Sequence, residues 1–233
     1  MQTEPTLADL VTAAPATARV LERHHLDYCC GGGQSLRTAC AEAGVDPDSV
    51  LAEIDALAAG PEADWTSLSP TELADHIEST HHAYLHEEMG RLSALATKVL
   101  AVHGGRHPEL VGVAETYAAL RADLEPHLAK EERVLFPMIR ELDAAATPPS
   151  VPRASVADPI RVMVREHDRA GELLARLRTL TNGFAPPTDA CASYRALYVA
   201  LEELEADTHL HVHKENNVLF PAVLGPGEGP ATS

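Results

Sequence analysis

The sequence has few basic residues, few aromatic residues and no long apolar run. It carries 18 Lys and Arg residues against 35 Asp and Glu residues, which gives a formal net charge of −17. Nucleic acids and anionic membranes attract basic surface patches, so this balance argues against both as partners. No apolar stretch is long enough to cross a bilayer as a helix, so we expect no membrane span.

Aromatic residues make up 4% of the chain, although 45% of its residues are hydrophobic. The core must therefore come from Leu, Val, Ala and Ile. This composition favours helix over sheet, and we expect an all-α protein. The 233 residues allow one medium domain with an appendage or two small domains.

Cysteine is scarce too, because there are only four, and two of them are the neighbours Cys29 and Cys30. This is not the pattern of a disulfide framework in a chain of this size. The first residues carry acids before the first base and lack a basic region followed by an unbroken apolar stretch, so no secretory signal is expected. Both observations predict a cytoplasmic location.

Gly, Pro and Ser residues divide the chain into two units near residue 60. Residues 1–59 predict three or four short helices, the last of which begins where Asp46 caps the helix and Pro47 takes its first position. Residues 225–233 predict a disordered tail. Residues 70–224 predict an antiparallel bundle of four long amphipathic helices, over about 70–102, 108–143, 158–182 and 188–224.

Proline sets two further expectations within the bundle. Asp158-Pro159 repeats the helix-start pattern and is expected to open the third long helix. Pro126 lies inside the second expected helix, where it removes a backbone donor and crowds the carbonyl of Ala122. We therefore expect a kink or a short break there.

The second and fourth long helices contain the same motif. Residues 127–137 (HLAKEERVLFP) align with residues 211–221 (HVHKENNVLFP). The first and third helices align as well, because His82 precedes His127 by 45 residues and His167 precedes His211 by 44. The bundle is therefore a duplicated helical hairpin, and each copy offers one single His and one His-x-x-x-Glu pair.

This repeat predicts a metal site. Residues four apart on an α-helix differ by roughly 40° in direction, so each His-x-x-x-Glu presents an imidazole and a carboxylate to one face. Two such pairs and two single histidines suit two metal ions with bridging carboxylates and an open position for a small ligand. Mixed imidazole and carboxylate ligation indicates iron or manganese more than calcium or structural zinc. Ferritin-like bundles instead use a carboxylate-dominated set with Glu-x-x-His.

Residues 70–224 resemble the hemerythrin-like di-iron bundle. With Asp27-Tyr28-Cys29-Cys30-Gly31-Gly32 upstream, the chain resembles the repair-of-iron-centres family. The resemblance implies a short helical domain of the ScdA N-terminal type and a four-helix bundle that holds two non-haem irons with oxo and carboxylate bridges. It implies that Glu131 and Glu215 bridge, that Glu166 and His103 lie near the irons without binding them, and that the ligands are His82, His127, Glu131, His167, His211 and Glu215.

For function, the resemblance implies repair of iron–sulfur clusters damaged by nitric oxide or peroxide, with iron supplied to damaged or metal-free clusters. The partners would be iron–sulfur proteins or their scaffold, with nitric oxide or oxygen as small ligands. A rival enzyme function is reduction of nitric oxide by the same irons, and a rival binding function is an oxygen or nitric oxide carrier or sensor. A structural zinc bundle is a fourth interpretation, and the sequence fits a monomer or a homodimer.

Several histidines have a simpler interpretation. The repeat and the resemblance select His82 over its neighbour His81, because adjacent helical residues differ by about 100° and only one is expected to face the core. His209 and His213 are expected to face solvent or to lie behind the ligands. Three more are expected at the surface: His76, His86 and His107.

The cysteines and the repeated Leu-Phe-Pro also have alternatives. Cys29 and Cys30 are either buried thiols in a tight glycine turn or an exposed dithiol with a redox or transfer role. Cys40 and Cys191 are expected to pack within helices. Core packing with a helix kink is expected at 135–137 and 219–221.

Overall fold

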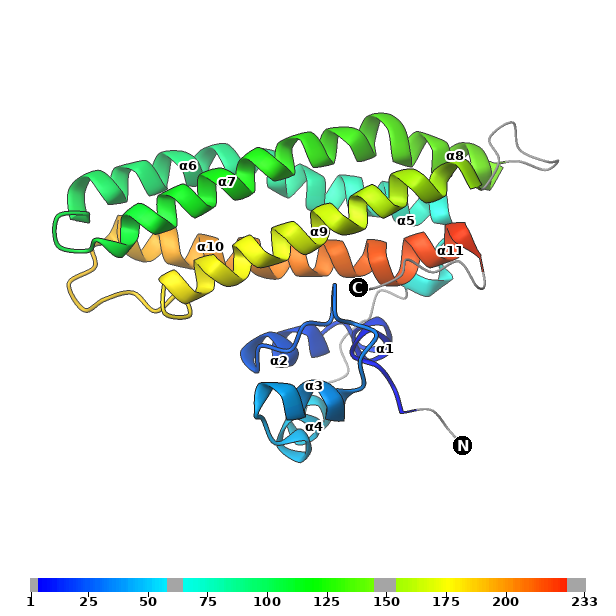
Figure 1. The fold of residues 1–233 in the computed structure, drawn as a ribbon, viewed down its shortest axis with the longest axis horizontal. Helices are drawn as coiled ribbons and strands as arrows, with labels where there is room; N and C mark the ends of the chain where they lie inside the picture. The colour runs from blue at the N-terminus through cyan, green and yellow to red at the C-terminus, as the bar shows by residue number, and fades with distance from the viewer. Residues whose placement is uncertain (1–3, 58–64, 145–153, 226–233) are drawn as a thin grey trace.

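The computed structural model describes residues 4–57, 65–144 and 154–225, so the expected tail lies outside the described residues from position 226 onward. The described residues form helices and one isolated β-bridge between Thr6 and Ser35. A small N-terminal helical unit lies beside a long bundle of helices (Figure 1). The prediction of an all-α fold is confirmed.

The N-terminal unit consists of four short helices: α1 (Leu7–Ala13), α2 (Thr17–Arg23), α3 (Leu36–Ala43) and α4 (Pro47–Asp55). The side chains of Thr6, Ser35 and Asp46 accept hydrogen bonds from first-turn N–H groups, which satisfies donors that a helix start leaves free. α3 ends at Gly44, whose φ of 69° favours glycine. The apolar faces meet in a core that includes Val11, Leu21, Leu36, Cys40 and Val50.

The bundle contains four long helices, three of which are built from consecutive segments. The first runs through α5 (Pro70–Ile77), η2 (Glu78–His82) and α6 (Ala83–His103). The second runs through α7 (Glu109–Lys130), η3 (Glu131–Leu135) and α8 (Phe136–Ala144). The third is α9 (Ala154–Leu180), and the fourth runs through α10 (Ala192–Lys214), η4 (Glu215–Leu219) and α11 (Phe220–Leu224).

These helices form a closed ring. α6 packs against α7 and α10, and α9 packs against the same two helices (Figure 1). Their shared core holds mainly Leu side chains together with Tyr117, Tyr194 and Tyr198. An interior of this kind can hold polar side chains only where they satisfy one another or bind a ligand.

The segments η2, η3 and η4 are turns of π-helix, in which backbone bonds reach five residues back. In η3 the Phe136 N–H donates to the Glu131 carbonyl, and η4 repeats this bond. Pro137 and Pro221 follow these two segments. Each lacks an N–H and crowds the carbonyl four residues earlier, and the wider turn relieves both effects. The expected kinks are therefore π-turns, around core residues that are buried as expected: Leu135, Phe136, Leu219 and Phe220.

Two expectations about where the long helices begin are wrong, and the break expected at Pro126 is absent. α7 runs through Pro126 without a break, because the packing of a 22-residue helix offsets the loss of one backbone bond. α9 begins at Ala154, so Pro159 lies inside it, and Asp158 pairs with Arg161 one turn later instead of capping the helix. The fourth long helix begins at Ala192 rather than near residue 188.

The N-terminal unit packs on the bundle through α10 and η4. Thr12 Oγ1 lies 3.2 Å from His213 Nε2, and the Asn217 side-chain amide donates to the Cys29 carbonyl at 3.0 Å. His213 is fully buried beside the ring of Tyr28, because the N-terminal unit covers α10 at this point. Of the two places expected for His213, in solvent or behind the ligands, its burial excludes solvent. One apolar cluster continues from the N-terminal unit into the adjoining end of the bundle.

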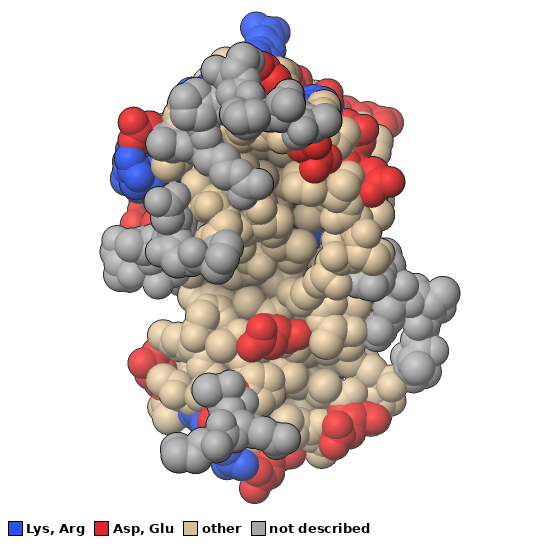
Figure 2. All heavy atoms as spheres, turned by 90° about the vertical axis from the view of Figure 1, so that its right-hand side faces the viewer, with Lys and Arg blue, Asp and Glu red and all other residues tan. Residues whose placement is uncertain are grey.

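The surface reflects the acidic composition. Figure 2 shows the end of the bundle near α8 and α11, where acidic side chains gather toward the edges and few basic ones are visible. Among the described helices, none combines the length and the apolar character that a bilayer span requires.

We expect Arg178→Met to destabilise the protein by about 3 kcal/mol, because it leaves a buried carboxylate without its cation. Arg178 on α9 and Glu205 on α10 form a forked ion pair, with Nε 2.8 Å from Oε2, and the Glu205 side chain is 3% exposed. Urea unfolding measures the change. The double variant Arg178→Met/Glu205→Leu is the control and should recover most of the stability, and an equal loss in both variants would contradict this explanation.

Candidate metal centre

The six residues predicted as ligands lie together inside the bundle. Each is at most 3% exposed: His82, His127, Glu131, His167, His211 and Glu215. Glu131 and Glu215 are the first residues of η3 and η4, and His82 is the last residue of η2. π-turns recur at functional sites in proteins, and here every π-turn of the described residues carries one of the six.

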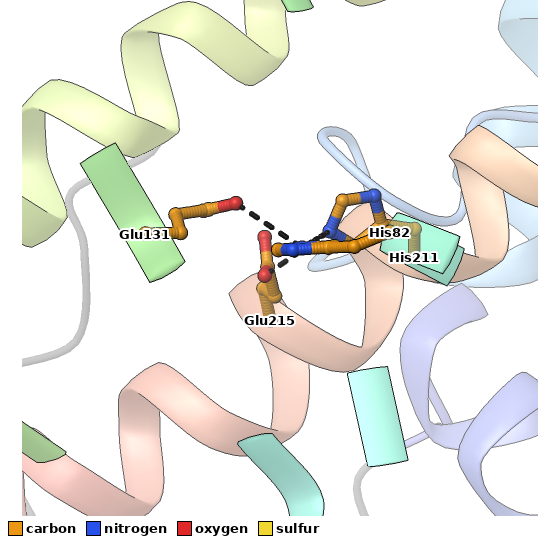
Figure 3. A group of neighbouring side chains, drawn as sticks. All are labelled: His82, Glu131, His211 and Glu215. Carbon is orange, nitrogen blue, oxygen red and sulfur yellow. Dashed lines mark hydrogen bonds and ion pairs between the residues drawn. The ribbon is translucent and has the colours of Figure 1, made fainter. Parts of the chain in front are cut away.

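Four of these side chains form a first group (Figure 3). His82, Glu131, His211 and Glu215 point toward one another from η2, η3, α10 and η4. His82 Nε2 lies 3.2 Å from His211 Nε2 and 3.5 Å from Glu131 Oε2. His211 Nε2 lies 3.2 Å from Glu215 Oε1. One atom from each residue can therefore face a single ion, since all four lie within 4.8 Å of one another.

A second group uses the same two glutamates with His127 and His167. The two Nε2 atoms lie 3.1 Å apart, His127 Nε2 lies 3.3 Å from Glu131 Oε1, and His167 Nε2 lies 3.1 Å from Glu215 Oε2. Each glutamate thus turns one oxygen toward each group. This is the arrangement that a carboxylate bridge between two ions requires.

The buried carboxylates are short of hydrogen-bond donors. Among the described residues, neither oxygen of Glu131 accepts a hydrogen bond of good geometry, and Glu215 Oε2 accepts none either. Burying a carboxylate without donors or a cation is strongly unfavourable. The free oxygens and the converging imidazole nitrogens therefore fit metal cations.

Three of the four histidine rings are held by a partner on their other nitrogen. Glu166 Oε2 lies 3.0 Å from His127 Nδ1, which places Glu166 beside the group as the resemblance implies. Sequence reasoning missed two further partners: Glu132 Oε1 lies 3.1 Å from His82 Nδ1, and Asn216 Oδ1 lies 2.9 Å from His167 Nδ1. Glu132 follows Glu131 and Asn216 follows Glu215, so the two partners occupy equivalent positions of the repeat. This equivalence is the sequence signal that could have identified them. An Nδ1–H donated to these groups leaves Nε2 free to bind a metal.

The two carboxylates change the charge preferences of the histidines. Burial disfavours the imidazolium of His167, but Glu215 and Glu131 outweigh burial and raise its pKa to about 9. The same carboxylates raise the pKa of His82 against the effect of burial. His211 and His167 hold the pKa of Glu215 well below its usual value, although burial alone would raise it. A metal cation competes with these protons, so its binding releases protons.

A second buried cluster lies behind His211. The ring of His81 stacks on that of His211 with centroids 5.5 Å apart. His81 Nε2 accepts a hydrogen bond from Lys214 Nζ at 2.7 Å, and Nδ1 lies 2.8 Å from Asp207 Oδ1. Burial lowers the pKa of Lys214 to about 8. The expectation that only one of His81 and His82 faces the interior is wrong, because both lie in the π-turn η2 and both are buried.

His103 lies far from the two groups. It ends α6, and its separation from His82 corresponds to about 30 Å along a helix. Its Nε2 lies 3.1 Å from Cys191 Sγ, and its ring packs near Tyr194. The expectation that His103 lies near the irons is therefore wrong.

Cys191 is the exposed N-cap residue of α10 rather than a packing residue. Of the three histidines expected at the surface, His86 is exposed, whereas His76 and His107 are half-buried.

Cys29 and Cys30 lie in the turn between α2 and α3. The Asp27 carboxylate accepts hydrogen bonds from the N–H groups of Cys29, Cys30 and Gly31, which fixes the turn. Cys29 is buried, Cys30 is half-buried, and the two sulfurs lie 3.9 Å apart. The hydrogen bond with Cys30 and burial raise the pKa of the Cys29 thiol. The turn thus hides one thiol and leaves the other partly accessible.

Two cavities adjoin the cysteine turn, and a third adjoins the histidines of the two groups. Two of them, of about 430 and 650 Å³, are both lined by Asp27, Cys29, Cys30 and Asp168. Asp168 directly follows His167 on α9, so these cavities lie next to a helix that also carries a member of the second group. The third is a cavity of about 10 Å³ whose lining includes His127, His167, His211, Leu124, Ala170 and Thr208.

Known proteins match almost the whole chain. The hemerythrin HHE cation binding domain matches residues 73–223, and the ScdA N-terminal domain, a domain of unknown function, matches residues 3–58. A probable iron–sulfur cluster repair protein of Haemophilus influenzae is 38% identical over 226 residues, which covers 94% of this chain and 96% of the relative. The iron–sulfur cluster repair proteins YtfE of Cronobacter sakazakii and Escherichia coli are each 37% identical over 219 residues, which covers 94% of this chain and 95% and 96% of the relatives. The chain therefore belongs to the family of iron–sulfur cluster repair proteins, in which the ScdA N-terminal domain precedes a hemerythrin domain.

Proposed function

We propose that this protein binds two non-haem irons in its bundle and repairs iron–sulfur clusters damaged by nitrosative or oxidative stress, by supplying iron. The observation that carries the proposal is that Glu131 and Glu215 each turn one oxygen toward each pair of histidines. Relatives named as iron–sulfur cluster repair proteins, which match 94% of the chain, support the repair role.

In this proposal His82 and His211 hold one iron and His127 and His167 hold the other, with both glutamates and an oxo group as bridges. Imidazole and carboxylate ligands suit iron and manganese, whereas structural zinc favours closed sites rich in thiolate or imidazole. Of the four histidines, His211 is the one whose Nδ1 has no partner among the described residues. Because such partners strengthen metal binding, the iron at His82 and His211 is the one released first.

In this proposal the cysteine turn assists the transfer. Cys30 is half-buried and lines two cavities together with Asp168, the neighbour of His167. The Asn217 amide ties the Cys29 carbonyl to η4, the segment that begins with Glu215. The recipient would be a damaged or metal-free iron–sulfur protein, or its scaffold, in the cytoplasm. Thiolates bind iron readily, so an accessible thiol beside the bundle can accept an iron that leaves it.

A second function uses the same irons on nitric oxide. The cavity of about 10 Å³ beside three of the histidines favours it, because a cavity of this size admits one small ligand. Two ferrous ions would supply the two electrons that, with two protons, convert two molecules of nitric oxide into nitrous oxide and water. An iron donor loses its metal as it acts, whereas a catalyst keeps it.

Glu131→Leu and Glu215→Leu are expected to abolish binding of the iron pair, since each removes a ligand of both ions. Iron analysis of the protein purified from iron-supplemented cells measures this, with two irons per chain expected in the wild type. The metal-free variants should be less stable to urea than the metal-free wild type, because the buried histidines lose the carboxylate that faces them. Glu125→Leu, six residues before Glu131 on the exposed side of α7, is the control and should keep both irons. Full iron content in either test variant would contradict the bridging model.

Glu132→Leu and Asn216→Leu should each weaken iron binding by about 10–100-fold, because each releases the Nδ1 atom of a histidine ligand. Competition with a coloured chelator gives the affinities. Asn217→Leu changes the neighbouring residue, which contacts the N-terminal unit, and should leave the affinity unchanged. Equal effects of Asn216→Leu and Asn217→Leu on the iron affinity would show that the contact between Asn216 and His167 does not strengthen iron binding.

Mixing the iron-loaded protein with a metal-free iron–sulfur protein and sulfide should restore the cluster of that protein while iron leaves the bundle. Cluster absorbance and the iron remaining on the donor measure the two sides of the transfer. Cys30→Ser is expected to slow the transfer several-fold without changing the iron content, and Cys40→Ser, which alters a buried thiol of α3, serves as control. Steady formation of nitrous oxide from nitric oxide with no loss of iron would instead support the second function.

A further inference from the structure

The small cavity beside the metal centre arises where the two halves of the repeat differ. In the register that aligns His82 with His167, Leu85 of the first copy corresponds to Ala170 of the second. In the register that aligns His127 with His211, Leu124 corresponds to Thr208. The second copy therefore has a smaller side chain at both positions, and both Ala170 and Thr208 line the cavity. The missing side-chain volume explains why a cavity exists on this side.

The cavity has a polar group that the first copy lacks. Thr208 is 1% exposed, and its Oγ1 has no hydrogen-bond partner within the described residues. A helical threonine usually bonds the carbonyl one turn earlier, and a buried hydroxyl without a partner is unfavourable. The hydroxyl therefore needs a partner that the described residues do not provide. The cavity next to it has room for about one water-sized group.

Part of the cavity lining is exposed to solvent. Two of its lining residues reach the surface between α7 and α9, because Asp123 is exposed and the Glu166 side chain is 32% exposed. The other lining residues that carry the argument, Leu124, Ala170 and Thr208, are buried. The part of the lining nearest to solvent is therefore at Asp123 and Glu166, and the buried residues close the other side.

We infer that Thr208 is a ligand-binding residue, whose hydroxyl donates a hydrogen bond to a ligand of one or two heavy atoms held in this cavity beside His127, His167 and His211. This inference rests on the proposed metal centre. It assigns the binding of nitric oxide or oxygen to the side of the centre that faces α7, α9 and α10. It also gives the second copy of the repeat a role that the first copy does not share.

The test uses nitric oxide as the probe, added to the reduced, iron-loaded full chain. Infrared spectra in H₂O and D₂O report whether a hydroxyl bonds the nitrosyl, because its N–O stretch then shifts between the solvents. Thr208→Val keeps the shape and removes the hydroxyl, so the solvent shift should disappear and nitric oxide should bind about three- to tenfold more weakly. Thr208→Ser keeps the hydroxyl and should retain the shift.

Thr116→Val is the matched control. Thr116 on α7 is also buried with an unpartnered Oγ1, but it does not line the cavity. Thr208→Val and Thr116→Val should both raise the melting temperature of the metal-free protein, since each removes an unsatisfied buried hydroxyl. Only Thr208→Val should alter the nitrosyl spectrum. A Thr208→Val protein that keeps its irons, the wild-type solvent shift and the wild-type affinity overturns the inference alone, whereas a wild type that binds no iron overturns the metal centre and this inference with it.

Discussion

The burial of two carboxylates is the constraint on which the rest of the bundle depends. Glu131 and Glu215 are 0% exposed, and most of their oxygens accept no hydrogen bond of good geometry. A helical bundle with a core of Leu and Tyr could not keep these charges unless cationic groups face them. Four histidines converge on them, and three of those rings are fixed from behind. The π-turns at Glu131 and Glu215 set the places where each glutamate enters the interior.

The duplicated hairpin supplies the ligands in pairs, and sequence differences between its two copies make the two sides of the metal centre different. Glu132 and Asn216 occupy equivalent positions and hold equivalent histidines. The symmetry fails elsewhere: Glu166 bonds His127, whereas its counterpart His81 stacks on His211. The side with Glu166 has the small cavity, whereas on the other side His81 accepts a hydrogen bond from Lys214, whose Nζ lies over the ring of Trp65. A pair of ions in such a frame would therefore have different surroundings on its two sides.

Sequence reasoning identified the helices and the six buried residues because a repeat makes a weak motif strong. One His-x-x-x-Glu is weak evidence for a metal site. Two copies in register with two single histidines are strong evidence, because the helix repeat brings all six side chains to the same interior. The sequence could not show the π-turns η3 and η4, since their cause is a proline that reads equally well as a kink. The π-turn η2 has no proline after it, so nothing in the sequence indicated that both His81 and His82 are buried. His103 was misplaced because a resemblance transfers residue types and not distances. Pro126 and Pro159 show that tertiary packing can override a local helix signal.

Anomalous X-ray scattering at the iron absorption edge, from crystals of the iron-loaded protein, tests the central claim most directly. The account predicts two neighbouring iron peaks, close enough for both to be bound by the same two carboxylates. One peak should lie within bonding distance of His82 and His211, the other within bonding distance of His127 and His167, and both should contact Glu131 and Glu215. A single peak, or peaks at Cys29 and Cys30 with none between the glutamates, would contradict it.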